Sequence, residues 1–196
     1  MNKKALALIC CLFLLLLSST VQAREGTYIA GHLGASLMTD SNVSVAGVPT
    51  GAASYKTGVN GAAAFGYSYV PGRVEVELNY NTNEIDGSSD TYDSLALMFN
   101  AYAEFFDQDV GFTTISTYIG GGLGVSQLTL DAATTDNSEF VFAWQLAFGL
   151  GWELSEKLIM DLGYRHFVTA DPAFDGGVLE VDYASNIIYL GLRFHL

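Results

Sequence analysis

Eight charged residues stand out because each falls on the same side of a segment in which small and large residues alternate. Three are arginines and five are acids: Arg73, Glu75, Glu77, Glu104, Glu153, Asp161, Arg165 and Arg193. Charges that share a narrow interior must pair, since burying an isolated ion costs several kcal/mol. Two hypotheses follow: a salt-bridge network that fills the interior, or a path for ions or protons in which surplus acids are protonated or hydrated.

The glycine run "YIGGGLG" at 118–124 is a second candidate, because glycine-rich loops can cradle phosphate. Phosphate loops lie between a strand and a helix, and no helical pattern follows this run. Gly120, Gly122 and Gly124 instead alternate on one face of a strand, where a crowded interior requires small side chains. We therefore predict no nucleotide site and no cofactor.

The three histidines, His32, His166 and His195, could act as general bases. Catalysis of that kind needs a nucleophile beside the base, and the sequence pairs none with them. His166, for example, is followed by Phe167 and Val168. We predict that the protein has no catalytic residues and is not an enzyme.

Acidic residues are also concentrated in the polar connections, where they could bridge divalent cations to phosphate groups of lipopolysaccharide. The connections lack the Asp-x-Asp spacing of a dedicated calcium site, so no metal ligand is predicted, and a hydrated rim is the simpler interpretation. These acids, accompanied by Lys56 as the one basic residue, are Asp40, Glu84, Asp86, Asp90, Asp93, Asp131, Asp136, Glu139, Asp171, Asp175, Glu180 and Asp182.

The elements that carry these residues are strands, as the segment "EFVFAWQLAFGLGWE" at 139–153 demonstrates. Its even positions from Phe140 to Leu154 are all large and apolar, and its odd positions are small or polar. A period of two is typical of a strand with one apolar face, whereas a helix would mix the two sets. The segment is also too short for a membrane-spanning helix, which needs about 20 residues.

The same alternation predicts eight strands, an even number that closes an antiparallel barrel. Tight turns are expected near Pro71-Gly72, Asp107-Gln108-Asp109 and Ser155-Glu156, and longer polar loops at 39–56, 85–90, 131–138 and 170–181. The expected strands are 28–38, 57–70, 73–84, 91–106, 112–130, the 139–153 segment, 157–169 and 182–196.

The two faces of these strands distinguish a membrane barrel from a soluble one. A secreted soluble barrel, the alternative, would turn its apolar face inward around a ligand. Here the face with large apolar residues recurs on every strand, and the other face carries Gly, Ala, Ser and charge. Small residues suit the inside of eight strands and large apolar ones suit lipid, so we predict a transmembrane up-and-down β-barrel.

The N-terminus has the features of an export signal. Lys3 and Lys4 precede an apolar run, and Val21-Gln22-Ala23 favours cleavage after residue 23. Residues 1–23 are then a signal peptide and 24–196 the barrel, without cysteine, because Cys10 and Cys11 lie in the signal. Loss of the two lysines changes the formal charge from −13 to −15, which argues against nucleic acid as a partner.

Three segments carry a family resemblance: "YIGGGLG" at 118–124, "AFGLGWELSEKLIMDLGYRHF" at 147–167 and the closing "IIYLGLRFHL". They resemble the small outer-membrane β-barrel family that includes the opacity proteins and the OmpA membrane domain. Some small lipid-modifying barrels use a His-x-Ser arrangement, which this chain lacks at His166. Chains of the family usually end in an aromatic residue read by the barrel-assembly machinery, whereas this one ends in Leu196, with Phe194 on the outward face.

Two classes of function remain open. The first is a non-enzymatic surface or structural barrel, with a lumen filled by paired charges and with acidic loops that contact a host or envelope ligand. The second is a narrow porin-like channel or small-ligand binder. Either would be a monomer in the bacterial outer membrane, surrounded by lipid and lipopolysaccharide.

Overall fold

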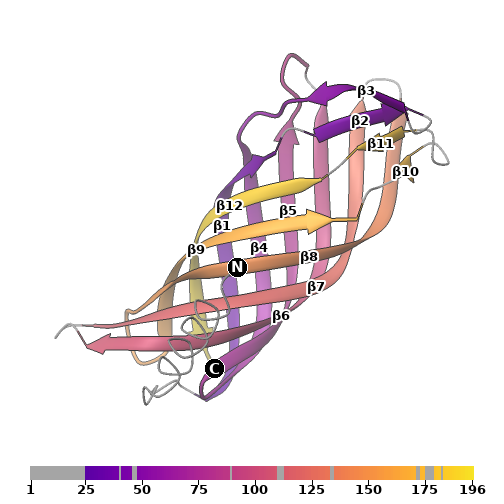
Figure 1. Cartoon of the computed structure of the whole chain (residues 1–196). Helices are drawn as coiled ribbons and strands as arrows, with labels where there is room; N and C mark the ends of the chain where they lie inside the picture. The colour runs from indigo at the N-terminus through magenta and orange to yellow at the C-terminus, as the bar shows by residue number, and fades with distance from the viewer. Residues whose placement is uncertain are drawn as a thin grey trace, which may run out of the picture.

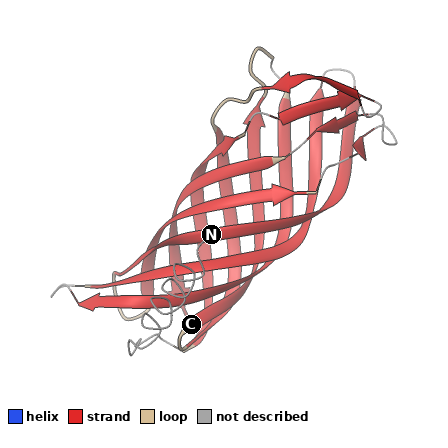
Figure 2. Cartoon of the chain, viewed as in Figure 1, coloured by secondary structure: helices blue, strands red, loops and turns tan. Residues whose placement is uncertain are grey.

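The computed structural model describes residues 25–39, 41–45, 48–88, 90–109, 113–132, 135–170, 173–174, 179–181 and 183–196 of the 196-residue chain. Strands are the regular structure of this part of the chain (Figure 2). No helix long and apolar enough to cross a membrane occurs among the described residues. The expected signal peptide at 1–23 lies outside them.

Eight antiparallel strands close into a barrel in the order β1-β12-β9-β8-β7-β6-β5-β4 (Figure 1). Each strand pairs with its sequence neighbours, and the last closes on the first, as an up-and-down barrel requires. The predicted fold class is confirmed. The barrel strands are β1 (Gly26–Met38), β4 (Gly58–Tyr69), β5 (Gly72–Glu84), β6 (Thr91–Asp109), β7 (Thr114–Ala132), β8 (Thr135–Glu153), β9 (Leu158–Thr169) and β12 (Ala184–His195).

The register sets the tilt of the strands. A line of paired residues that starts at Tyr28 returns to β1 at Met38, ten residues further along (38 minus 28). Ten residues of about 3.3 Å against eight strand spacings of about 4.8 Å correspond to a tilt of roughly 40°. The line passes through Gly66, Glu75, Asn100, Gly122, Gln145, Phe167 and Ser185.

The two faces of the wall are those expected from alternation. On β4, Val59, Phe65 and Tyr67 are exposed on the outside, whereas Asn60, Ala64 and Ser68 are buried inside. Val59 and Tyr69 lie ten residues apart on that strand, which at this tilt is about 25 Å of barrel height. This is the height of the apolar band of an outer-membrane barrel.

Two predicted connections are in fact strand. Residues 107–109 were expected to turn, but β6 continues to Asp109, which pairs with Thr114. The expected loop 131–138 is largely a continuation of the β7–β8 hairpin, in which Ala132 pairs with Thr135. Polar residues do not end a strand beyond the bilayer, because both of its faces are then in water and the hairpin satisfies its own backbone groups.

Two long loops also contain strands that alternation did not predict. Residues 39–56 contain β2 (Ser41–Val45) and β3 (Val48–Ala53), and residues 170–181 contain β10 (Ala173–Phe174) and β11 (Leu179–Val181). They form one small sheet in the order β10-β11-β2-β3, at the end of the barrel opposite the tight turns (Figure 1). The sheet joins the first and last of the long loops.

Candidate functional site

An ion pair crosses the middle of the lumen. Arg165 on β9 donates from both terminal nitrogens to Glu77 on β5, at 2.8 Å to Oε1 and 2.6 Å to Oε2. Both side chains are fully buried. His32 Nδ1 lies 3.6 Å from Glu77 Oε2, and the Arg165 guanidinium lies 5.1 Å from the centre of the Tyr189 ring. Two parallel charge-assisted bonds give this pair a fixed geometry as well as attraction.

A second cluster lies near the short-turn end of the lumen. Glu104 Oε1 accepts hydrogen bonds from Arg73 and, at 2.7 Å, from Arg193. Arg193 also donates to both oxygens of Asp161, at 3.0 and 3.3 Å. These four charges alternate in sign along the chain of contacts, so each buried ion has an opposite neighbour.

Aromatic rings enclose this cluster. The Arg73 guanidinium lies 4.1 Å from the centre of the Tyr102 ring and 4.4 Å from that of Tyr118. The two rings are perpendicular to each other, and a guanidinium over aromatic ring faces gains cation–π attraction in addition to its ion pair. Arg73 is therefore held by the two tyrosine rings as well as by the Glu104 carboxylate.

The remaining two charges are held differently. Glu75 is buried, and neutral donors bind its carboxylate: Tyr28 Oη at 2.7 Å, Tyr102 Oη at 3.1 Å and Asn100 Nδ2 at 3.2 Å. Glu153, at the end of β8, is only half-buried. Of the eight predicted residues, the structure thus joins six in buried ion pairs, gives Glu75 hydroxyl and amide partners, and leaves Glu153 at the edge.

A ladder of amides extends the network, and alternation alone did not single it out. Asn60 Nδ2 donates to Asn79 Oδ1 at 2.7 Å and to Asn81 Oδ1 at 2.8 Å, and Gln145 Nε2 donates to Asn100 Oδ1 at 2.7 Å. The signal was present in "NYNTN" at 79–83, where asparagine recurs at every second position. Such spacing places all three amides on the inward face.

Four buried tyrosines each lie directly across from a glycine on the neighbouring strand. Tyr189 pairs with Gly163, and a Cβ added at Gly163 would collide with the Tyr189 ring. The inward glycines therefore provide the space into which the rings fold, which is a more specific role than the general need for small residues. The other pairs are Tyr28 with Gly66, Tyr102 with Gly120 and Tyr118 with Gly149.

An apolar cluster fills the lumen near the long loops. Met38 ends β1, and Tyr92 and Leu128 lie close to the ends of β6 and β7 that carry the long loops. Phe167 and Tyr183 pack in an edge-to-face arrangement with their ring centres 6.0 Å apart. All five are buried. These large inward residues were missed because alternation assigned large apolar side chains to the lipid face.

A serine and a histidine that are distant in sequence meet at the short-turn end. Ser68 Oγ lies 3.3 Å from His195 Nε2, and both residues are buried. The centres of the Tyr28 and His195 rings lie 5.6 Å apart, with the rings tilted by 48° to each other. The described residues contain no group of three or more His, Cys, Asp or Glu that could hold a metal ion.

The rim at the long-loop end of the barrel contains an exposed ion pair between Lys56 and Glu84, with Nζ to Oε2 at 2.9 Å. The hydrogen bond and the charge of Glu84 raise the pKa of the Lys56 amine. Lys56 therefore stays protonated at neutral pH beside the acidic loops.

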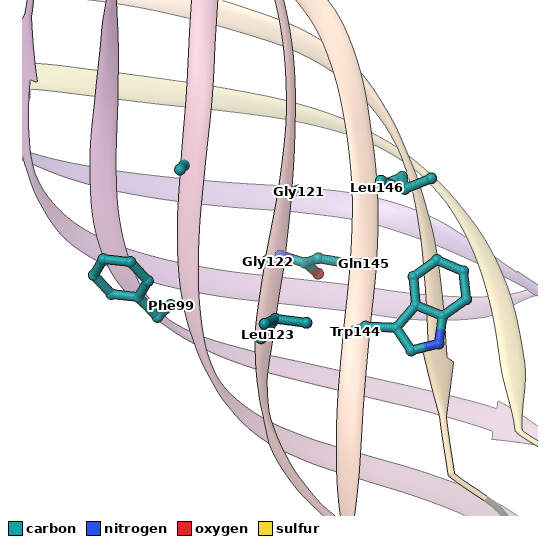
Figure 3. Close-up of a pocket in the computed structure, with 8 residues that line it drawn as sticks. Phe99, Gly121, Gly122, Leu123, Trp144, Gln145 and Leu146 are labelled. Carbon is teal, nitrogen blue, oxygen red and sulfur yellow. The ribbon is translucent and has the colours of Figure 1, made fainter.

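Among the described residues, hollows also occur on the outer wall of the barrel. One of them has a volume of 440 Å³. Figure 3 shows Phe99, Leu123, Trp144 and Leu146, which line it together with Gly121. These residues belong to the outward set of β6, β7 and β8. The groove therefore faces the surroundings of the barrel.

Comparison with known proteins agrees with this architecture. The family profile described as "Outer membrane protein beta-barrel domain" matches residues 9–194. No curated protein matches the chain.

Similar solved structures include Neisserial surface protein A, at 16% identity and a TM-score of 0.65, with 90% of this chain and 100% of that chain covered. The N-terminal β-barrel domain of Pseudomonas aeruginosa OprF has 14% identity and a TM-score of 0.53, with 88% and 100% covered. Outer membrane protein OprG from Pseudomonas aeruginosa has 16% identity and a TM-score of 0.53, with 87% and 97% covered.

Proposed function

Since the chain belongs to the outer membrane protein β-barrel family, which places it in the bacterial outer membrane, we propose that it is a non-enzymatic surface or structural barrel. Its lumen is closed by side chains, and its external loops contact a host or envelope ligand. The lumen network is the set of buried charges and amides around Glu77, Arg165, Glu104 and Arg193.

The observation that carries this proposal is the pair that crosses the lumen. Arg165 and Glu77 are fully buried on strands β9 and β5, which are separated by three strands on either side of the ring. An eight-stranded interior is only wide enough for side chains. The cluster of Arg73, Glu104, Arg193 and Asp161 lies on the short-turn side of this pair, and the apolar cluster lies on the long-loop side. Water and ions that cross the lumen would have to displace all three layers of side chains.

Planar-bilayer recording tests the closed lumen. Refolded wild-type protein should give no reproducible single-channel steps, whereas Arg165→Ala, which removes half of the crossing pair, should leak or fail to fold. The heat-modifiable shift of folded barrels on gels identifies the second case. Steady openings of the wild type would overturn the proposal and favour the narrow channel.

The absence of catalysis is tested at the buried Ser68–His195 contact. Activated serines react with fluorophosphonate probes, and we expect no labelling of Ser68, because Ser68 and its neighbour His195 are both buried. Labelling that is lost in Ser68→Ala would contradict the non-enzymatic assignment.

We propose that the long loops, on the outside of the cell, form the surface that contacts the ligand. The backbone sheet formed by β2, β3, β10 and β11 brings loops 39–56 and 170–181 together, and 85–90 joins them through the bridge between Tyr55 and Ile85. The loops are acidic, so we propose a basic ligand or one bridged by divalent cations. Replacing residues 41–53 by a short Gly-Ser linker should abolish attachment to host cells or envelope fractions without unfolding the barrel.

Biogenesis completes the proposal. We propose that residues 1–23 are cleaved on export, that the barrel-assembly machinery recognises the C-terminal strand through Phe194, and that the folded protein is a monomer. Phe194 points outward and is 41% exposed. N-terminal sequencing of mature protein tests the cleavage, and Phe194→Ala should lower the amount assembled in the outer membrane.

A further inference from the structure

A cluster of polar side chains interrupts the apolar outer wall on β9 and β12. Asn186 Oδ1 accepts a hydrogen bond from Tyr164 Oη at 2.6 Å and lies 2.9 Å from His166 Nδ1. Asn186 Nδ2 donates to Thr39 Oγ1 over a longer distance of 3.4 Å. The ring of Trp144 packs edge-on against His166, with the ring centres 5.9 Å apart. Tyr164, His166 and Asn186 lie on outward positions of β9 and β12, and Thr39 directly follows β1.

The cluster leaves hydrogen-bonding capacity unused. A carbonyl oxygen only accepts, so His166 Nδ1 donates to Asn186, and in the tautomer with its hydrogen on Nδ1 the other ring nitrogen, Nε2, is an acceptor. Asn186 has a second amide hydrogen beyond the one shared with Thr39. In the part of the chain that the structure describes, neither group has a partner. A ligand that offers both a hydrogen-bond acceptor and a donor at this position can pair with both groups.

An apolar groove continues directly from the cluster. It has a volume of 570 Å³ and is lined by outward residues that include Tyr164, Phe148, Leu162 and Ile188. The Tyr164 ring lies 5.1 Å from the Phe148 ring inside the groove, while its hydroxyl belongs to the cluster. Tyr164 thus connects the polar cluster to the apolar groove, and an amphiphile has the same combination of a polar end and an apolar chain.

The depth of the cluster indicates which part of a lipid it meets. Asn186 lies on β12, ten residues before Leu196, which directly follows the strand; at a tilt of roughly 40° this separation is about 25 Å of barrel height. That is the full height of the apolar band, so the cluster lies at its outer boundary. Acyl chains are joined to their head groups at this boundary through ester or amide links.

We propose that this outer wall binds one acylated glycolipid of the outer leaflet, lipopolysaccharide. One acyl chain occupies the groove below Tyr164. The ester or amide carbonyl of that chain accepts from Asn186 Nδ2, and a hydroxyl of the lipid donates to His166 Nε2. The acidic loops above the cluster play no part in this contact.

The two tryptophans provide matched reporters of the surrounding lipid. Trp144 adjoins the cluster, and Trp152 lies eight residues further along β8 toward the short-turn end. The variants Trp152→Phe and Trp144→Phe each retain one reporter. Both are refolded into vesicles of dibrominated phosphatidylcholine, which quenches tryptophan, and unlabelled lipopolysaccharide is then added.

Lipopolysaccharide should relieve the quenching of Trp144 at a several-fold lower mole fraction than that of Trp152. Asn186→Leu and His166→Leu, in the Trp152→Phe background, should each remove about 2- to 10-fold of this preference, the effect of one hydrogen bond. Leu162→Phe fills the groove with a larger side chain. Phenylalanine is used rather than tryptophan because a tryptophan at this position would act as another fluorescent reporter. The control Phe65→Leu, on the exposed face of β4, should have no effect.

Three outcomes would overturn the proposal. Equal relief at both tryptophans would mean that the site has no preference for the lipid. Unchanged relief in Asn186→Leu and His166→Leu would mean that the cluster is an interfacial anchor without a ligand. Relief by fully deacylated lipopolysaccharide would mean that the sugar binds elsewhere and that the groove is not used.

Discussion

Arg165 and Glu77 form a bidentate ion pair that joins opposite walls of the barrel, with N–O distances of 2.8 and 2.6 Å. Arg165 lies on β9 and Glu77 on β5, and neither side chain is accessible to solvent. Neither residue can relax toward water if its partner is removed. The pair therefore links the stability of the barrel to the closure of its lumen.

Breaking this pair should destabilise the barrel strongly. Arg165→Ala leaves the Glu77 carboxylate buried without its main partner, and we expect a loss of about 3–5 kcal/mol in the free energy of unfolding. Urea unfolding in lipid vesicles, followed by tryptophan fluorescence, measures it. Lys56→Ala, which breaks an exposed pair at the rim, should leave the midpoint nearly unchanged. A similar midpoint for both variants would show that the buried pair is not structurally important.

Replacing both members of the pair should be far milder than removing one. In Arg165→Met combined with Glu77→Leu no charge is left uncompensated, so stability should recover most of the loss, as for other buried pairs exchanged for apolar residues. His32, 3.6 Å from Glu77, loses a neighbour in this variant but not a strong hydrogen bond. The same urea experiment decides, and a double variant no more stable than Arg165→Ala would argue against this account.

The tyrosine–glycine pairs predict an unusual sensitivity to a single methyl group. Gly163→Ala places a Cβ against the Tyr189 ring and should cost about 1–3 kcal/mol, the usual cost of overpacking. Gly61→Ala is the matched control, because its added Cβ faces outward with Leu33 Cδ2 at an ordinary 3.7 Å. If the two variants unfold at the same urea concentration, the ring does not need the space.

The lipid face should show a dependence on depth. Phe148 is 56% exposed on the outer wall, near the middle of the apolar band, so Phe148→Arg should cost about 2–4 kcal/mol. Phe140 is 73% exposed toward the loop end of the same strand, and Phe140→Arg should cost about 0–1 kcal/mol. Refolding into vesicles compares them, and equal costs would mean that the band lies at a different height.

Labelling of whole cells tests the topology. A cysteine at Ser88, in the 85–90 loop, should react with an impermeant maleimide on intact cells. A cysteine at Glu156, in the turn between β8 and β9, should react only after the outer membrane is permeabilised. The mature chain has no cysteine of its own if cleavage follows residue 23, so the background is low. The opposite labelling pattern would mean that the barrel has the opposite orientation in the membrane.

The sequence by itself determined the strands and their faces. Alternation in "EFVFAWQLAFGLGWE" is enough, because side chains in a strand point to opposite sides and a bilayer forces every backbone group to pair. The count of eight strands, the lipid-facing set and the inward position of all eight charges follow from that rule. The same rule failed beyond the bilayer, where it missed the continuation of β6 to Asp109 and the loop strands β2, β3, β10 and β11.

Only the tertiary structure decided which inward residues meet. Parity places Glu75 and Glu77 alike, yet Glu77 pairs with Arg165 and Glu75 accepts from two tyrosines and an asparagine. Contacts across a lumen depend on the register summed over every strand, and the offset of ten residues around the ring is not encoded in any one segment. The seating of Tyr189 on Gly163 depends on that register too, because it requires two strands to be aligned residue by residue.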